Sequence, residues 1–137
     1  MKLKNFEKLQ GIIKRAVIWD EDTIEEMEKK LGKMYQNLTN IFFKEKLLTD
    51  DLQTELKKMY SDLFIELKTK SNRAYDTKHE VDTVINSNED YYRKTLEFNK
   101  QKAILKWIEK TMDNLNNIKF EIKDYMNWKL FKSGMKF

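Results

Sequence analysis

Apolar residues recur at helical spacing through most of the chain. Between residues 21 and 46 they return every three or four positions, as on the buried face of an amphipathic helix. This stripe consists of Ile24, Met27, Leu31, Met34, Leu38 and Ile41. Asp20 or Asp22 can accept hydrogen bonds from the first free amides, and Glu25 and Glu26 suit the positive end of the helix dipole. The pattern predicts a long helix over about residues 21–46.

A second stripe of the same spacing follows Thr49-Asp50-Asp51, a sequence typical of a helix start. It consists of Leu52, Leu56, Met59, Leu63 and Leu67. A short joint at residues 47–49 would make the two helices antiparallel neighbours, which predicts an αα-hairpin. A short helix over residues 3–14 and an extended connector held by Trp19 are expected before the hairpin.

Residues 71–86 interrupt this pattern, and we expect an irregular, mostly polar loop there. The residues that indicate brief extended structure within it are Val81, Val84 and Ile85. Ser87 is expected to cap a third long helix, which ends or kinks near residues 114–117. The apolar stripe of that helix consists of Tyr92, Leu96, Ala103, Ile104, Trp107, Ile108, Met112 and Leu115.

The last helical segment, which begins near residue 118, carries apolar residues on more than one face. They are Ile118, Phe120, Ile122, Tyr125, Met126, Trp128, Leu130 and Phe131. A helix buried on one side only does not have this distribution. Either the helix is central to the domain, or its second face packs on other subunits, and its terminal position favours the second interpretation. Ser133-Gly134 is expected to end it.

Composition favours the same fold class. The chain of 137 residues, one domain by length, contains no Pro and only three Gly, whereas a β-rich domain needs many such turn formers. Charged residues make up 36%, as in long amphipathic helices. The predicted fold is therefore all-α: an αα-hairpin of long amphipathic helices, a third long helix and a C-terminal helix. Because the mean hydropathy is low, part of the core is expected to form with a partner subunit.

Residue types that support catalysis are scarce. The absence of Cys excludes disulfides, thiolate zinc sites and a Cys nucleophile, and it fits a reducing cytosol. The only His, His79, has no Ser or Cys at a telling spacing and fits a solvated loop residue. The sequence has neither a GxxxxGK[ST] loop nor a metal-ligand cluster. We therefore expect no enzyme, metal or cofactor. The polar N-terminus and the lack of a long apolar run predict neither a signal peptide nor a membrane span.

Positive charge is distributed unevenly. Residues 93–137 contain 11 Lys and Arg against 5 Asp and Glu, whereas the whole chain has a formal net charge of +4. One basic group, interleaved with Tyr60, Phe64 and Tyr75, consists of Lys57, Lys58, Lys68, Lys70 and Arg73, with Lys78 further on. Single-stranded nucleic acid is held by cations along its backbone and aromatic rings under its bases. An ordinary solvated helix face has the same spacing, so both interpretations stay open. A second group, from Arg93 to Lys110, fits the solvated side of a helix.

Several motifs occur in a telling order in the C-terminal half. Thr83-Val84-Ile85 leads into the acidic helix start Asn88-Glu89-Asp90, and a long helix through Trp107 follows. Then come Phe120-Glu121-Ile122-Lys123 and an ending from Trp128 to Gly134. Near the N-terminus, the matching positions are Leu9, Gln10, Lys14, Val17 and Asp20. In this combination the chain resembles the UvsY family, the recombination mediators of T-even-like bacteriophages.

The resemblance implies a non-enzymatic protein that binds single-stranded DNA and forms a ring-shaped homo-oligomer, a heptamer, through its C-terminal helices. It implies that the ring helps to load a RecA-like recombinase of the UvsX type onto DNA coated by the phage single-strand-binding protein. This would serve recombination-dependent replication and DNA repair in the cytoplasm of the infected bacterial host. Residues 1–86 would bind DNA and residues 87–137 would assemble the ring. The implied oligomerisation residues are Trp107, Ile122, Tyr125, Met126, Trp128 and Phe131.

The sequence departs from the family at the expected DNA contacts. Aligned without gaps, the family's principal basic pair falls on Ser61 and Leu63, which carry no charge, and the following basic loop is shortened to residues 71–75. The candidates for binding single-stranded DNA are therefore the nearby cations Lys57, Lys58, Lys68, Lys70 and Arg73. A helical adaptor or structural protein that binds only other proteins explains the helices equally well, but it does not need this cluster.

Overall fold

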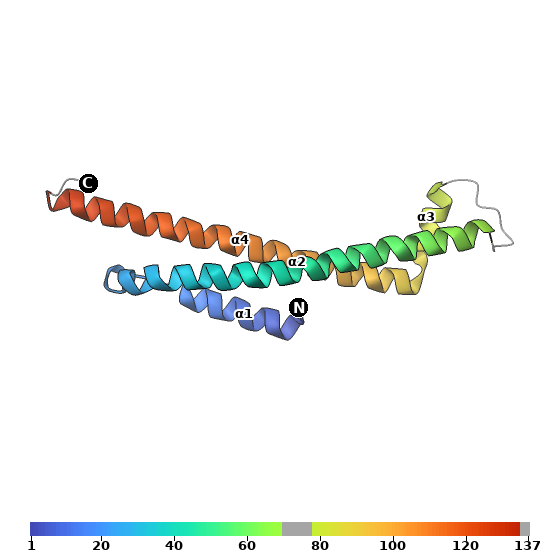
Figure 1. Ribbon diagram of the computed structural model, residues 1–137, viewed down its shortest axis with the longest axis horizontal. Helices are drawn as coiled ribbons and strands as arrows, with labels where there is room; N and C mark the ends of the chain where they lie inside the picture. Colours follow the sequence, from blue (N-terminus) through green and yellow to red (C-terminus); the bar gives the residue numbers. More distant parts are fainter. Residues whose placement is uncertain (70–77, 135–137) are drawn as a thin grey trace. The chain divides into compact units, whose positions relative to one another are not determined.

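The computed structural model describes residues 1–69 and 78–134, and all regular structure in these ranges is helical (Figure 1). A single turn of 3₁₀ helix, η1 (Glu21–Thr23), precedes the second α-helix. The α-helices are α1 (Leu3–Ala16), α2 (Ile24–Thr69), α3 (Lys78–Ser87) and α4 (Glu89–Lys132). The all-α prediction is confirmed.

The connector between α1 and α2 ends in a reciprocal cap. Oδ1 of Asp20 accepts hydrogen bonds from the backbone N–H groups of Asp22 and Thr23, each at 3.0 Å. Oγ1 of Thr23 in turn accepts from the backbone N–H of Asp20 at 3.0 Å. These bonds satisfy amides that have no partner within the helix, and they fix where it begins. Of the two predicted caps, Asp20 is the one used.

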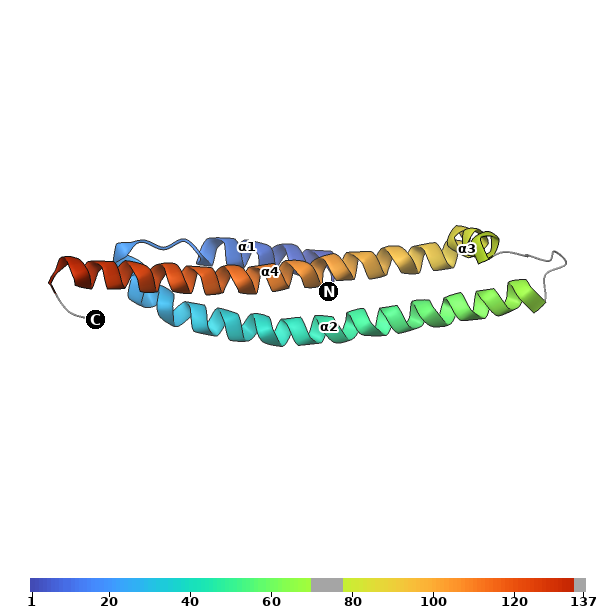
Figure 2. The ribbon, with the colours of Figure 1, turned by 90° about the horizontal axis from the view of Figure 1, so that it is seen from above.

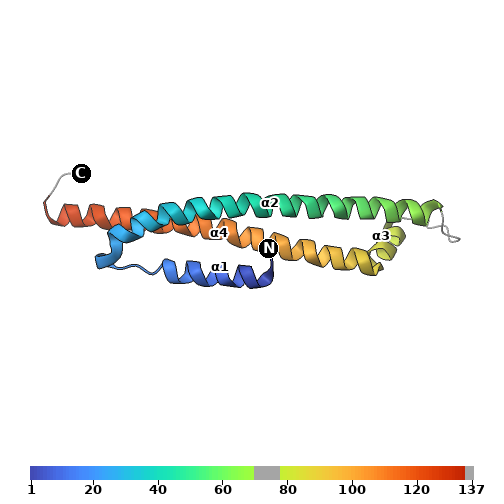
Figure 3. The same ribbon diagram turned by 60° about the horizontal axis from the view of Figure 1, so that its bottom comes forward.

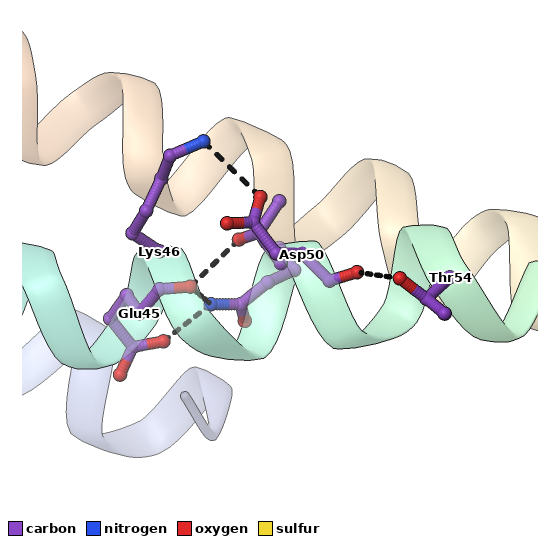
Figure 4. A network of polar contacts seen from close by, with 6 residues as sticks. Glu45, Lys46, Asp50 and Thr54 are labelled. Carbon is purple, nitrogen blue, oxygen red and sulfur yellow. Dashed lines mark hydrogen bonds and ion pairs between the residues drawn. The ribbon is translucent and has the colours of Figure 1, made fainter.

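The predicted hairpin joint at residues 47–49 is wrong, because α2 is one continuous helix of 46 residues. The hydroxyl of Thr54 donates to the backbone carbonyl of Asp50 at 3.0 Å, and Nζ of Lys46 lies 3.2 Å from the Asp50 carboxylate (Figure 4). Polar side chains that could have capped a new helix are thus bonded within the existing one. The predicted helices before and after the joint are therefore one element, and they do not form a hairpin with each other.

Two predictions about the second half of the chain fail for a related reason. Val81 and Ile85, expected in a loop, are buried on one face of α3, since positions four apart meet on a helix. Asn88 and not Ser87 caps α4, because Oδ1 of Asn88 accepts from the backbone N–H of Tyr91 at 3.0 Å. α4 then continues without interruption to Lys132, so the predicted third and C-terminal helices are one. Gly134, with φ of +79°, follows its end as predicted.

The chain divides into two compact units, and neither unit ends at residue 86. The first unit consists of Met1–Lys44 and Lys106–Phe137, and the second of Glu45–Leu105. In each unit a stretch of α2 lies beside a stretch of α4 (Figure 2). The second unit also contains α3, whose buried face shares the unit's core with Leu56 and Ile104.

The first unit also contains α1, which packs against α4 (Figure 3). The rings of Phe6 and Trp107 meet edge to face, with centroids 5.3 Å apart. Trp19, in the connector, contacts Tyr125 with centroids 6.2 Å apart, so the prediction that Trp19 holds this connector is confirmed. The buried apolar residues of this unit are Ile13, Met27, Leu31, Leu38, Ile108, Leu115 and Ile122.

The second unit buries a polar cluster between α2 and α4. Glu45 and Gln101 are only 4% and 5% exposed, and Nε2 of Gln101 donates to the Glu45 carboxylate and to its backbone carbonyl. The hydroxyl of Thr49, also buried, donates to the same carbonyl at 2.8 Å. A shift of one helix along the other would separate these groups and leave a carboxylate buried without its partner, so the cluster favours one register.

Candidate nucleic-acid interface

The end of α2 and the beginning of α3 border a solvent-open pocket of about 520 Å³ in the second unit. Its lining residues from α2 are Tyr60, Ser61, Phe64, Ile65 and Lys68, and Lys78 lines it from the first turn of α3. We call this the α2–α3 pocket. The α2 residues recur at helical spacing, so the amphipathic pattern of this segment places them on one face.

Aromatic rings form a row beside the pocket. The rings of Tyr60 and Phe64 are stacked, with centroids 6.3 Å apart and planes inclined by 25°. On its other side Tyr60 meets Tyr91 of α4, with centroids 6.4 Å apart. Ile65 adds an aliphatic side chain that is 57% exposed. The pocket therefore combines an apolar, largely aromatic lining with free access from solvent.

A hydrogen bond to α3 fixes the far end of the Tyr60 ring. The Tyr60 hydroxyl donates to Oδ1 of Asp82, a residue half-buried on α3. This bond, together with desolvation, raises the pKa of the Tyr60 hydroxyl above its ordinary value. A tyrosine that is held at both its apolar body and its polar tip presents its ring in a defined position.

Lysines accompany the pocket along α2. Lys57 lies four residues before Ser61 and eleven before Lys68, which places all three on one face of the helix. Nζ of Lys68 is 5.9 Å from the centroid of the Phe64 ring, within the range of a cation–π contact. Lys58 is exposed and lies seven residues before Ile65. The structure thus brings three of the five predicted DNA-binding residues beside the pocket, whereas Lys70 and Arg73 lie outside the described residues.

The second basic group is largely occupied by local contacts. Nζ of Lys94 lies 2.5 Å from the Glu55 carboxylate and 3.7 Å from that of Glu97. The hydrogen bond to Glu55 raises the pKa of the Lys94 ammonium above its ordinary value. Arg93 pairs with Glu89 one turn earlier in α4. These contacts favour a solvated helix face for this group, as the sequence indicated.

A second surface lies on the last part of α4. Its exposed apolar residues, which we call the C-terminal apolar surface, are Phe120, Met126, Trp128, Leu130 and Phe131. Trp128 is 53% exposed and Phe131 69%, and Nζ of Lys132 lies 4.5 Å from the Trp128 ring centroid. Large apolar groups left in contact with water are typical of sites that bind another protein.

The remaining predicted oligomerisation residues lie elsewhere. Ile122 is only 1% exposed and belongs to the core of the first unit. Trp107 is half-buried against Phe6, and Tyr125 is half-buried between Trp19 and Trp128. The end of α4 thus contributes to the core of its own chain and also exposes a second apolar face, so each of the two sequence interpretations describes part of it.

Other kinds of site leave little trace in the described residues. Residues 1–69 and 78–134 contain no group of three or more His, Cys, Asp or Glu that could hold a metal ion. None of the helices in these ranges combines the length and apolar character needed to cross a membrane. His79 is exposed on α3. Sequence reasoning missed Asp82 and Tyr91 beside the pocket, because only the packing of α3 and α4 brings them to α2.

Comparison with known proteins supports these assignments. Three crystal structures of the bacteriophage T4 recombination mediator protein UvsY share the fold. The lattice type II structure has a TM-score of 0.81 at 17% identity, over 97% of this chain and 98% of that one. Lattice type IV gives 0.79 at 16%, over 96% and 99%, and lattice type I gives 0.77 at 15%, over 91% and 98%. No curated protein matches the sequence.

A family model shows the relationship at the level of sequence. It is described as "Recombination, repair and ssDNA binding protein UvsY" and matches residues 13–135, nearly the whole chain. The order of motifs that resembled this family is therefore a true family signature. The chain belongs to the UvsY family of recombination, repair and single-stranded-DNA-binding proteins.

Proposed function

We propose that this protein is a recombination mediator that binds single-stranded DNA along the second half of α2. The observation that carries the proposal is the placement of Lys57 and Lys68 on the same helix face as the α2–α3 pocket. Lysines can neutralise successive phosphates, and exposed aromatic rings can contact bases. Membership of a family described as binding single-stranded DNA supports the same role.

The proposed active form is a homo-oligomeric ring, a heptamer by the resemblance. Each subunit offers only a few cations, but a ring repeats them around one strand. Linked sites raise the effective concentration, so avidity can exceed the affinity of one site by about 10²–10⁴. In this proposal residues 1–86 bind DNA and residues 87–137 assemble the ring, with Met126, Trp128 and Phe131 as its exposed contacts.

The proposed reaction is an exchange of binding partners and involves no covalent chemistry. The ring engages DNA coated by the phage single-strand-binding protein, weakens the hold of that protein, and presents the strand to a RecA-like recombinase of the UvsX type. The setting is recombination-dependent replication and repair in the cytoplasm of the infected bacterial host. Phosphate contacts suit this role because they do not depend on base sequence.

A salt titration tests DNA binding directly. Anisotropy of a labelled oligo(dT) strand gives the binding constant of the full chain at several salt concentrations. Its logarithm should fall linearly with the logarithm of salt concentration, by about 0.7 for each phosphate neutralised. Absence of binding at low salt, or strong binding that salt does not change, would contradict the proposal.

A protein-only adaptor is the second candidate, and the C-terminal apolar surface is the observation that favours it. Such an adaptor would assemble and bind partners without using the lysines of α2. Alanine at Lys57, Lys58 and Lys68 separates the two functions, because these side chains are exposed and their removal should leave assembly intact. Unchanged DNA binding in this variant would favour the adaptor or a DNA site elsewhere.

A further inference from the structure

The α2–α3 pocket has a lining that phosphate binding does not require. Cations on a polar helix face are enough to hold a DNA backbone. Here, however, Tyr60, Phe64 and Ile65 form an apolar surface between the lysines and leave it open to solvent. The volume of about 520 Å³ falls within the range of roughly 300–1,000 Å³ typical of pockets for small ligands. The pocket is therefore suited to a flat, largely apolar group that is joined to negative charge.

We propose that the α2–α3 pocket holds one unstacked nucleobase of the bound strand, with the base against Tyr60 and Phe64 and the neighbouring phosphates near Lys68 and Lys78. This inference rests on the proposed function and specifies which part of the DNA the site contacts. Every base has a π-face, so a stacking site of this kind tolerates any sequence, as a mediator requires.

The charges around the pocket give the base an orientation. Lys68 and Lys78 line it with positive charge, whereas the carboxylate of Asp82 lies at the hydroxyl end of Tyr60. A phosphate is attracted to the first two groups and repelled by the third. Because Nζ of Lys68 is 5.9 Å from the Phe64 ring centroid, it can reach a phosphate that flanks a base lying on that ring.

The same contacts organise the pocket before DNA binds. Asp82 holds the Tyr60 hydroxyl, and Tyr91 supports the ring from α4. A ring already held in place loses less conformational freedom on binding, which favours affinity. Asp82 is in this respect a positioning residue and does not itself contact the base.

The test compares two strands of equal length, oligo(dT) and the same backbone with abasic tetrahydrofuran units. Both carry the same phosphates, so a purely electrostatic site binds them equally. We expect the full-length protein to bind the abasic strand about tenfold or more weakly at one salt concentration, with the same salt dependence. Equal affinity for the two strands would overturn the inference and leave the proposed function standing. Failure to bind either strand would remove both.

Two substitutions locate the effect. Phe64→Leu keeps an apolar side chain but removes the ring, so it should weaken oligo(dT) binding about tenfold and leave abasic binding unchanged. Phe98→Leu is the matched control, because Phe98 also lies under a lysine, Lys102 at 5.4 Å, but does not line the pocket. Unchanged oligo(dT) binding by Phe64→Leu would overturn the assignment.

Two further readouts cover other results. Light scattering on Phe64→Leu shows whether the pocket instead receives a side chain of a second copy. A smaller assembly together with equal losses on both strands would establish that occupant and overturn the base site. If thermal unfolding shows that Phe64→Leu does not fold, the comparison of the two strands on the unaltered protein decides alone.

Discussion

The side-chain amide of Gln101 on α4 donates to the carboxylate of Glu45 on α2, so a buried polar contact joins residues 56 positions apart in the chain. A carboxylate in an apolar core is costly unless its partner is in place. The contact therefore discriminates between alignments of two long helices whose apolar stripes alone would tolerate a slip of one turn. A single polar position fixes register in the same way in coiled coils.

Gln101→Leu should lower the free energy of unfolding by about 3 kcal/mol, because it leaves the Glu45 carboxylate buried without its amide partner. Urea denaturation followed by circular dichroism measures this change. The double variant Glu45→Leu/Gln101→Leu should recover much of the loss, since two apolar residues can replace a buried polar pair. A single variant as stable as the unaltered protein would show that the contact does not constrain the fold.

Alanine at Lys57, Lys58 and Lys68 should weaken binding to oligo(dT) and reduce the salt slope by about 0.7 for each phosphate that is no longer neutralised. The matched control is alanine at Lys29, Lys30 and Lys33, which are equally exposed on α2 but belong to the first unit. Both triple variants should unfold at the same denaturant concentration as the unaltered protein. An equal weakening of binding in the control would show that only net charge matters.

Tyr60→Phe should change how stability depends on pH at the alkaline end. Because the bond to Asp82 raises the pKa of Tyr60 in the folded state, its contribution is complete below the unfolded-state pKa of about 10. It is lost as the pH rises through the higher folded-state pKa. Unfolding measured from pH 8 to pH 11, a range of about one to two pH units around that value, should therefore decline less steeply in Tyr60→Phe. Parallel curves for the two proteins would argue against this hydrogen bond.

Alanine at Met126, Trp128 and Phe131 should reduce the mass measured by light scattering while the helical content is kept. These side chains are exposed, whereas a truncation near Asn117 would also remove Ile122 from the core. Phe43→Ala is the control, because Phe43 is a similarly exposed ring on α2. An unchanged mass in the triple variant would place assembly on another surface.

Helix ends with one dominant signal were predictable from the sequence. The cap at Asp20 and the stop at Gly134 each depend on a few neighbouring residues, so local chemistry determined them. Thr49-Asp50-Asp51 was misleading, because the same side chains can either cap a helix or bond within one. Val81 and Ile85 were misleading because their β-branched character obscured a spacing of four residues.

The candidate site was predictable to a similar degree. Lys57, Tyr60, Phe64 and Lys68 follow one another on α2, so their spacing alone indicated a basic, aromatic face. The contact of Tyr60 with Asp82 depends on how α3 folds back onto α2, which no local pattern encodes. Ile122 shows the opposite error, since an apolar residue looks the same in sequence whether its own chain or a partner buries it.

All three tryptophans lie in the first unit, where Trp19 and Trp107 contact other rings and Trp128 lies exposed under Lys132. The α2–α3 pocket contains a tyrosine and a phenylalanine but no tryptophan. Tryptophan emission is therefore a natural reporter of the first unit and of the surface around Trp128, whereas tyrosine emission reports the second unit as well. The chain thus carries its own spectroscopic labels, and subunit assembly and strand capture can be followed as separate signals in one unmodified sample.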